Sequence, residues 1–424
     1  MRVLIVNTSE KTGGAAVASN RLMVALNNNG VKAKMLVRDK VSDDITVVEL
    51  PNKAMQQWKF LWERFKIFVN LRFRRKHLFE VDTASCGTDI TSLPEFKEAD
   101  VIHLEWINQG MLSLADINKI LNSGVPVVWT MHDLWPASSI CHYAKGCLNF
   151  KSGCHNCRLL PGNGSDNDLS ARVWQKKNKV YGKSSIQFVT CSRWLETQAK
   201  ESALLRNQLV VSIPNPIDTL IFKVKDKQAA REHFALPKDM RIILFVSQRV
   251  TDERKGMSYF VEAIKKMVSE NPNLAENTAI AILGGHSDDI VEDLPLKSYS
   301  LGYIGNEKEI VNVYNSADMF VLPSVEDNLP NTIMEAMACG VPCVGFNVGG
   351  IPEMIDHKKN GYVANYKDAA DLAEGMRWVL DGADIKELSR QAVAKVASHY
   401  SQRAVALRYI DVYNEAMAKK SYRL

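Results

Sequence analysis

The chain has 424 residues, of which 46% are hydrophobic and 24% are charged, proportions typical of a globular protein. No apolar run approaches the roughly 18 residues that span a bilayer, and the apolar part of the opening MRVLIVNTSE is too short for a signal peptide. The eight cysteines are too sparse for a disulfide scaffold, so a reducing cytoplasm is the expected compartment. At this length, two domains of about 200 residues each are expected.

Apolar strands separated by helical stretches run through the first half of the chain. They are expected at RVLIVN, AKMLV, VIHLEW, VPVVWTM and IQFVTCS. After the first strand, Gly13 and Gly14 lead into a helix, where glycine lets backbone N–H groups approach a donor phosphate closely; a plain tight turn is the alternative. Neither G-x-G-x-x-G nor a P-loop lysine is present, so the sequence does not indicate an NAD enzyme or an NTPase.

Residues 53–80 carry much of the positive charge of residues 1–210, which hold 28 Lys and Arg against 19 Asp and Glu. Apolar residues, most of them aromatic, recur there at helical spacing between eight basic side chains, at positions 58, 61, 62, 65, 68 and 69. This pattern predicts a helix that lies in an anionic membrane surface. The alternative is a surface helix that packs the stripe on its own domain. Nucleic-acid binding is not indicated, because no recognisable fold motif accompanies the charge.

Four cysteines lie within 17 residues of one another, at Cys141, Cys147, Cys154 and Cys157. A cluster of this kind in a polar loop indicates a structural zinc or iron–sulfur site, although the spacing is not that of a standard zinc finger. Reduced thiols are an equal alternative, and a disulfide pair is the third.

The second half begins after IPNPID, residues 213–218, a stiff proline-containing segment that we take as the domain linker. Its strands are expected at RIILFVS, AIAILGG, SLGYIG, MFVLPS and PCVGF. The strand RIILFVS leads into Arg249 and, a few residues later, Lys255. Cations in a loop after a strand end can neutralise a diphosphate leaving group, and the alternative for each is a solvated charge.

Residues 317–353 form the most informative segment of the chain. A short helix is predicted from Asn331 to Ala338 between two strands, with Gly340 as its stop. Its N-terminus is expected at the carboxyl ends of the strands, where free N–H groups and the helix dipole bind anions. Glu335 is placed in the first turn, and Glu326 and Asp327 precede it, so carboxylates are available for sugar hydroxyls. The segment therefore predicts a sugar-nucleotide site; a capped, solvated helix start is the alternative.

The same segment resembles the donor-site signature of retaining glycosyltransferases of family 4, which have the GT-B architecture. In that family two glutamates separated by seven residues precede an EAMA-like run. Glu335 matches the second glutamate, whereas Asp327 stands at the first position, with Glu326 as the alternative one residue away. The resemblance implies that Glu335 binds the donor ribose, that Asp327 contacts the transferred sugar, and that Arg249 and Lys255 contact the diphosphate.

Further roles follow from the resemblance. Tyr303 and Ile304 match the segment that contacts the nucleobase, and Asn331 and Thr332 open the donor helix. His132, which ends the strand VPVVWTM, matches a histidine near the transferred sugar and is implied to orient and stabilise charge. No D-x-D motif of the metal-dependent type appears, so catalysis is expected to need no metal or other cofactor.

The fold implied by the resemblance is α/β, with two Rossmann-like doubly wound domains facing an interdomain cleft. Residues 1–213, with the cysteine-rich insertion 141–157, would form the acceptor-side domain, joined by a returning C-terminal helix, 401–424. Residues 214–400 would bind the nucleotide-sugar donor.

The cysteine-rich insertion, GGAAVASNRL and EDNLPNT are similar to a bacterial capsule and exopolysaccharide branch of the family, of the colanic-acid type. The implied function is a cytoplasmic retaining hexosyltransferase, peripheral on the inner face of the cell membrane. It would move a sugar from a nucleotide diphosphate sugar to a polyprenyl-linked glycan. A GT-B sugar-nucleotide epimerase and a non-catalytic glycan- or membrane-binding protein are the alternatives.

Overall fold

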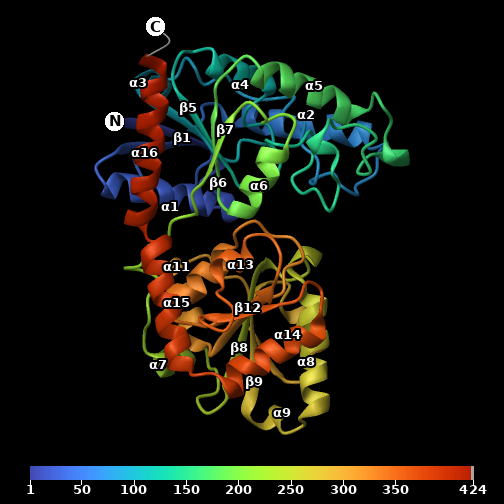
Figure 1. The fold of residues 1–424 in the computed structure, drawn as a ribbon, viewed down its shortest axis with the longest axis vertical. Coiled ribbons are helices and arrows are strands. Elements are labelled where there is room, and N and C mark those ends of the chain that lie inside the picture. The colour runs from blue at the N-terminus through green and yellow to red at the C-terminus, as the bar shows by residue number, and fades with distance from the viewer. Residues whose placement is uncertain (422–424) are drawn as a thin grey trace. The chain divides into compact units, whose positions relative to one another are not determined.

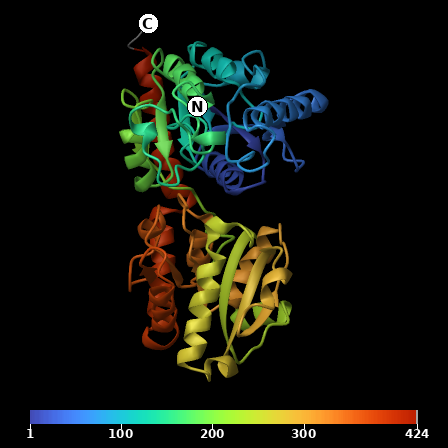
Figure 2. The same ribbon diagram turned by 90° about the vertical axis from the view of Figure 1, so that its right-hand side faces the viewer.

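The computed structural model describes residues 1–421, and the chain divides into two compact units. One unit is formed by residues 1–214 together with the chain from Val405 onward, and the other by Asn215–Ala404. The boundary lies one residue after the predicted one, and the returning segment begins at Val405 rather than at 401. Each unit has its own parallel sheet covered by helices (Figures 1 and 2).

Within its described residues, the first unit has a seven-stranded sheet in the order β3-β2-β1-β4-β5-β6-β7. The strands are β1 (Arg2–Ser9), β2 (Lys32–Asp39), β3 (Val47–Glu49), β4 (Val101–Leu104), β5 (Val127–Met131), β6 (Gln187–Thr190) and β7 (Leu209–Ser212). The strand order reverses between β1 and β4, where Val3 pairs with Val101 and Val6 with Leu104. Ligands of open α/β sheets bind beyond the carboxyl ends of the strands at such a reversal.

Helices cover both faces of this sheet. They are α1 (Gly14–Asn28), α2 (Lys53–Asn70), α3 (Pro94–Glu98), α4 (Leu114–Leu121), α5 (Leu169–Tyr181), α6 (Arg193–Glu201) and α16 (Gln402–Ser421), with short 3-10 turns at Asn149–Lys151 and Pro161–Asn163. Ser113 opens α4 through a capping box with Asp116, and Asp168 caps α5, because these side chains accept hydrogen bonds from free backbone N–H groups. The cap of α1 is Gly13, whose φ of 93° favours glycine.

Alternate residues of β1 point to opposite faces of the sheet and join different cores. Leu4 and Val6 belong to one cluster, and Val3 and Ile5 belong to the other. The last helix, α16, completes the second cluster with five buried residues, Val405, Ala406, Tyr409, Val412 and Tyr413. Burial on both faces explains why the strands read as continuous apolar runs.

The second unit has a six-stranded parallel sheet in the order β10-β9-β8-β11-β12-β13, as far as the chain is described. Its strands are β8 (Arg241–Arg249), β9 (Thr278–Gly285), β10 (Lys297–Ser300), β11 (Met319–Leu322), β12 (Cys343–Phe346) and β13 (Gly361–Ala364). Its helices are α7 (Lys227–His233), α8 (Met257–Glu270), α9 (Leu274–Asn277), α10 (Asp288–Val291), α11 (Glu307–Ser316), α12 (Asn331–Ala338), α13 (Ile351–Met354), α14 (Ala369–Arg377) and α15 (Ile385–His399), with a 3-10 turn at Glu253–Lys255 and a π-helical turn at Trp378–Gly382.

Most of the predicted strands are confirmed, but the strand at SLGYIG is wrong. The strand β10 ends at Ser300, and the backbone then turns through Gly302, whose φ is 63°. Strands β3, β7 and β13, which span three or four residues each, are not predicted from the sequence. The helix predicted at Asn331 to Ala338 is confirmed as α12, and Gly340 follows it with a φ of 74°.

Candidate functional site

The loop between β11 and α12 carries a carboxylate that meets a cation from another loop of the same unit. The Nζ atom of Lys255 lies 2.5 Å from Oδ2 of Asp327, and the Ser324 hydroxyl donates to the same oxygen at 3.2 Å. Asp327 lies four residues before Asn331, the first residue of α12. The pair therefore places a positive and a negative side chain just before a helix N-terminus, where the free backbone N–H groups favour an anion.

Two glycines let the neighbouring backbone segments come close enough to form this pair. A Cβ atom at Gly256 would lie 1.8 Å from the carbonyl oxygen of Pro323, and one at Gly349 would lie 1.7 Å from that of Asp327. Both glycines have positive φ, 73° and 58°. The Val325 N–H also donates to the carbonyl of Arg254 at 2.8 Å. Gly256 and Gly349 thus hold the Lys255 and Asp327 loops at contact distance.

Glu335 lies just beyond the first turn of α12, whereas the sequence predicts it within that turn. It is the fifth residue of α12, and the first turn contains no acidic residue, so its expected place in that turn is wrong. Its side chain is buried and accepts a hydrogen bond at 2.9 Å from the hydroxyl of Tyr314 on α11. A partner for Glu335 on α11 cannot be read from the local sequence pattern.

The first residues of α12 are held in different ways. The Asn331 side-chain oxygen accepts from the Asn215 amide at 2.9 Å. The buried Thr332 hydroxyl oxygen has no hydrogen-bond partner among the described residues. Unsatisfied buried polar atoms are uncommon in folded proteins, so this hydroxyl at the start of α12 is a notable exception.

The remaining predicted donor residues lie on loops of the second unit. Arg249 ends β8 with an exposed side chain, and Glu326 is half-buried beside Asp327. Tyr303 is exposed and Ile304 half-buried in the turn that follows β10. Among the predicted donor residues of this unit, Lys255 and Asp327 are in direct contact through their side chains.

In the first unit, Gly13 and Gly14 lie at the start of α1, and His132 directly follows β5. The Nε2 atom of His132 lies 2.5 Å from Oε2 of Glu105, and its Nδ1 atom lies 3.5 Å from the Cys191 sulfur. His132 is 10% exposed and Glu105 only 1%. Burial alone lowers the pKa of His132, but contact with Cys191 and with the Glu105 carboxylate raises it well above its ordinary value. The direction of this shift favours the protonated, cationic form of His132.

A second histidine, His103, also lies beside Glu105, but its pKa is lowered. The Nε2 atom of His103 lies 3.4 Å from Oε1 of Glu105 and 2.8 Å from the Thr130 hydroxyl. Its Nδ1 atom lies 2.7 Å from the hydroxyl of Tyr413 on α16. Complete burial lowers the pKa of His103, and the positive charge of His132 also lowers it, although Glu105 opposes both. Glu105, His103 and Tyr413 were not predicted from the sequence. Glu105 could have been found, because Glu105 and His132 each directly follow one of two neighbouring strands, β4 and β5.

Helix α2 exposes several of its aromatic residues, whereas three of its four buried residues are polar. Trp58, Leu61 and Phe65 are 55%, 54% and 50% exposed, and Trp62 stacks on both Trp58 and Phe65. The buried residues of α2 are Gln56, Glu63, Arg64 and Ile67. The alternative to membrane contact, that the stripe packs on its own domain, therefore does not hold for these residues. No helix in the described part of the chain combines the length and apolarity needed to cross a bilayer.

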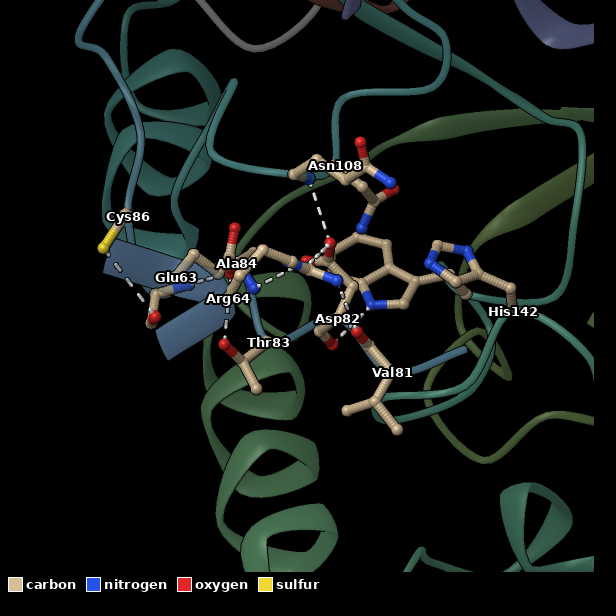
Figure 3. Close-up of polar contacts among 12 residues, drawn as sticks. Glu63, Arg64, Val81, Asp82, Thr83, Ala84, Cys86, Asn108 and His142 are labelled. Atoms are coloured by element: carbon tan, nitrogen blue, oxygen red, sulfur yellow. Dashed lines mark hydrogen bonds and ion pairs between the residues drawn. The ribbon is translucent and has the colours of Figure 1, made fainter. Parts of the chain in front are cut away.

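A buried polar network anchors the inner face of α2 (Figure 3). The Arg64 guanidinium donates to Oδ2 of Asp82 at 2.8 Å and to the carbonyls of Leu78 and Val81. The Glu63 carboxylate accepts from the backbone of Ser85 and, in addition, from the Thr83 hydroxyl. Burial and the nearby Asp82 charge raise the pKa of Glu63 to about 8, so this group is protonated at neutral pH. The network accounts for the outward aromatic face, because the opposite face of α2 is committed to it.

The four clustered cysteines are unpaired and half-buried. Burial, together with the neighbouring thiols, raises the pKa of Cys141 to about 11 and that of Cys154 to about 12. Within residues 1–421, no group of three or more His, Cys, Asp or Glu side chains is arranged to hold a metal ion. A structural metal at Cys141, Cys147, Cys154 and Cys157 stays a prediction.

Residues 240–382, which include β8, β11 and α12, match the family described as glycosyl transferases group 1. The match covers less than half of the chain, so it is a likeness of this segment to that family. The segment contains Arg249, Lys255, Tyr303, Asp327 and Glu335. The D-inositol 3-phosphate glycosyltransferase of Thermobispora bispora is 28% identical over 222 residues, which are 49% of this chain and 51% of that protein. The chain spans about half the length of the curated relatives it matches.

Solved structures resemble nearly the whole chain, beyond the segment that matches the family. Sucrose-phosphate synthase from Thermosynechococcus elongatus has a TM-score of 0.65 at 18% identity, covering 99% of this chain and 100% of that one. Anabaena Alr3699/HepE in complex with UDP has a TM-score of 0.62 at 16% identity, covering 98% and 100%. These likenesses establish the fold, which is GT-B with two Rossmann-like units, as expected from the sequence.

Proposed function

We propose that this chain is a retaining, metal-independent hexosyltransferase. In this proposal it transfers a sugar from a nucleoside diphosphate sugar to a polyprenyl-linked intermediate of a capsular or exopolysaccharide glycan. The observation that carries the proposal is the contact of Lys255 with Asp327 just before α12, because one side chain suits a diphosphate and the other a sugar hydroxyl. The group 1 match of residues 240–382 supports a glycosyl-transfer reaction.

The reaction breaks the bond between the anomeric carbon and the diphosphate oxygen, so negative charge develops on the departing nucleotide. Lys255, Arg249 and the N–H groups of α12 would stabilise that charge more strongly in the transition state than in the bound donor. The acceptor hydroxyl would attack from the face that the diphosphate leaves and give its proton to the leaving group. Within the first unit, His132 supplies a positive charge that Glu105 maintains.

A nucleoside diphosphate sugar as donor has support from a relative of the same fold. Anabaena Alr3699/HepE has been solved with UDP and with UDP-glucose. The unsatisfied Thr332 hydroxyl at the start of α12 offers a hydrogen bond to such a donor.

The proposal also includes attachment to the inner, anionic face of the cell membrane through residues 53–80. Trp58, Leu61, Trp62 and Phe65 would insert at the interface, because they are exposed on one side of α2. Arg72, Arg74, Arg75 and Lys76 follow directly after the helix with exposed side chains, where they can approach lipid phosphates.

The experiment that tests donor binding is thermal stabilisation of the purified protein by UDP, GDP, ADP, CMP and dTDP. One nucleotide should raise the midpoint, since a ligand at about 100 times its Kd adds about 2.7 kcal/mol to the stability of the folded state. Lys255→Ala and Glu335→Ala should each weaken this effect by on the order of 10-fold in affinity. Lys265→Ala, an exposed lysine on α8, is the matched control. Equal stabilisation of Lys255→Ala, Glu335→Ala and wild type would refute the assignment of the donor site.

A further inference from the structure

The first unit contains a cavity of about 680 Å³ between α2, α4 and α5. Its volume is in the range of sites that hold small molecules, roughly 300–1,000 Å³. None of the predicted catalytic or donor residues lines it. The apolar part of its wall comes from Ala84, Leu114, Ala115, Leu169, Val173 and Val180.

Four lysines line the same cavity, and none of its lining residues is acidic. Lys176 and Lys179 lie three residues apart on α5, so their side chains share one side of that helix, and Lys183 follows two residues after its end. Lys66 comes from α2, on the other wall. Glu63, which lies behind Thr83, adds little negative charge at neutral pH because burial, together with Asp82, raises its pKa to about 8. The cavity thus combines an apolar wall with a concentrated positive charge.

The cavity meets the exposed aromatic face of α2 at Lys66. The Nζ atom of Lys66 lies 5.6 Å from the centre of the Trp62 ring, and Trp62 stacks on Phe65. A molecule whose head group entered the cavity would therefore have its apolar part beside the aromatic side chains. An amphiphile with an anionic head fits this arrangement, whereas a free sugar nucleotide would leave the aromatic face unused.

We propose that this cavity binds the phosphate-bearing head group of an anionic membrane lipid. The phosphate would lie among Lys66, Lys176, Lys179 and Lys183, and the first carbons of the lipid would pack on Val173 and Val180. The cavity would then hold one defined lipid, in addition to the general attraction of a basic segment to a membrane. This inference rests on the proposed membrane attachment for the source of its ligand, and it does not require transferase activity.

The test measures binding of dihexanoylphosphatidylglycerol, below its micelle concentration, to the full-length protein by calorimetry. Lys176→Gln, Lys179→Gln and Lys183→Gln combined should weaken binding by on the order of 100-fold, at roughly 1 kcal/mol per lysine. A control that removes the same charge from exposed positions outside the cavity, Lys97→Gln, Arg172→Gln and Arg206→Gln combined, should bind as wild type does. Val173→Trp should also abolish binding, because the larger side chain occupies the apolar part.

Two further binding measurements, with inorganic pyrophosphate and with vesicles of phosphatidylcholine and phosphatidylglycerol, distinguish a lipid from a free phosphate anion and from general membrane attachment. Pyrophosphate that binds as tightly as the lipid would overturn the proposal, since the apolar wall would then contribute nothing. Equal weakening by both charge variants would overturn it too, because only overall charge would matter. Trp58→Ser, Trp62→Ser and Phe65→Ser combined should lose vesicle binding yet retain the short-chain lipid. That result would separate this cavity from the membrane attachment, and loss of both would overturn the cavity as an independent site.

Discussion

Glu105 lies between two histidines whose pKa values move in opposite directions. Its two oxygens approach His132 at 2.5 Å and His103 at 3.4 Å, yet the pKa of His132 is raised and that of His103 is lowered. The difference arises because His132 also contacts Cys191 while His103 is fully buried between hydroxyl groups. One carboxylate therefore supports one imidazolium and one neutral imidazole.

Glu105→Gln should remove the support for the positive charge of His132. The pH profile of kcat/KM should lose its activity at the basic end, with a decrease on the order of 100-fold at pH 8, because His132 then deprotonates at lower pH. Glu105→Asp should restore part of this activity. An unchanged profile for Glu105→Gln would show that the carboxylate does not set the charge of His132.

The contact of His132 with Glu105 should also make the free energy of unfolding depend on pH. Because the pKa of His132 is higher in the folded state than in the unfolded one, its stabilising contribution is fully present below about pH 6.5, the ordinary histidine value. It is lost as the pH rises through the raised value. Urea unfolding of wild type should therefore show a larger decrease in stability between pH 6 and pH 9 than that of Glu105→Gln.

At the scale of elements, α2 is a helix whose exposed side is more apolar than its buried side. Replacing Trp58, Trp62 and Phe65 by serine should leave the free energy of unfolding almost unchanged, because these side chains are exposed. Binding to vesicles with anionic lipid should weaken by about 100-fold or more, since each aromatic residue loses about 1.5–3 kcal/mol of burial in the interface. Cosedimentation of the protein with these vesicles measures the binding. The exposed Val41→Ser and Leu209→Ser are controls in the same unit.

The sequence pattern located elements better than it located contacts between them. The bounds of α12 follow from Asn331, Gly340 and the flanking strands, all of which are local. The hydrogen bond of Tyr314 to Glu335 and the contact of Lys255 with Asp327 join segments 21 and 72 residues apart, so no local pattern encodes them. The orientation of α2 depends on the partners of Arg64, which come from residues 78–82 beyond the helix.

At the scale of the whole molecule, α16 ties the end of the chain to the middle of the first sheet. The Tyr413 hydroxyl lies 2.7 Å from His103, and the Tyr409 hydroxyl lies 2.9 Å from Thr130. Both tyrosines are buried in the core that α16 completes. The first unit is therefore built from two pieces of chain, whereas the second is continuous.

Tyr413→Phe should lower the free energy of unfolding by about 1–3 kcal/mol, because it leaves a buried histidine nitrogen without its partner. Leu407→Ala, which changes an exposed position on the same helix, should stay within about 0.5 kcal/mol of wild type. Urea denaturation at fixed pH compares the three proteins. Equal stability of Tyr413→Phe and wild type would show that the buried contact contributes nothing net.

The position of α16 also determines the order in which the newly made chain can finish folding. A ribosome delivers residues 1–214 before the second unit, but the core around Val3 and Ile5 lacks Val405, Ala406, Tyr409 and Tyr413 until the second unit has been translated. The continuous second unit has all its strands some 40 residues earlier, when β13 emerges. The half that is synthesised first is thus completed last, and until then its exposed apolar face favours aggregation.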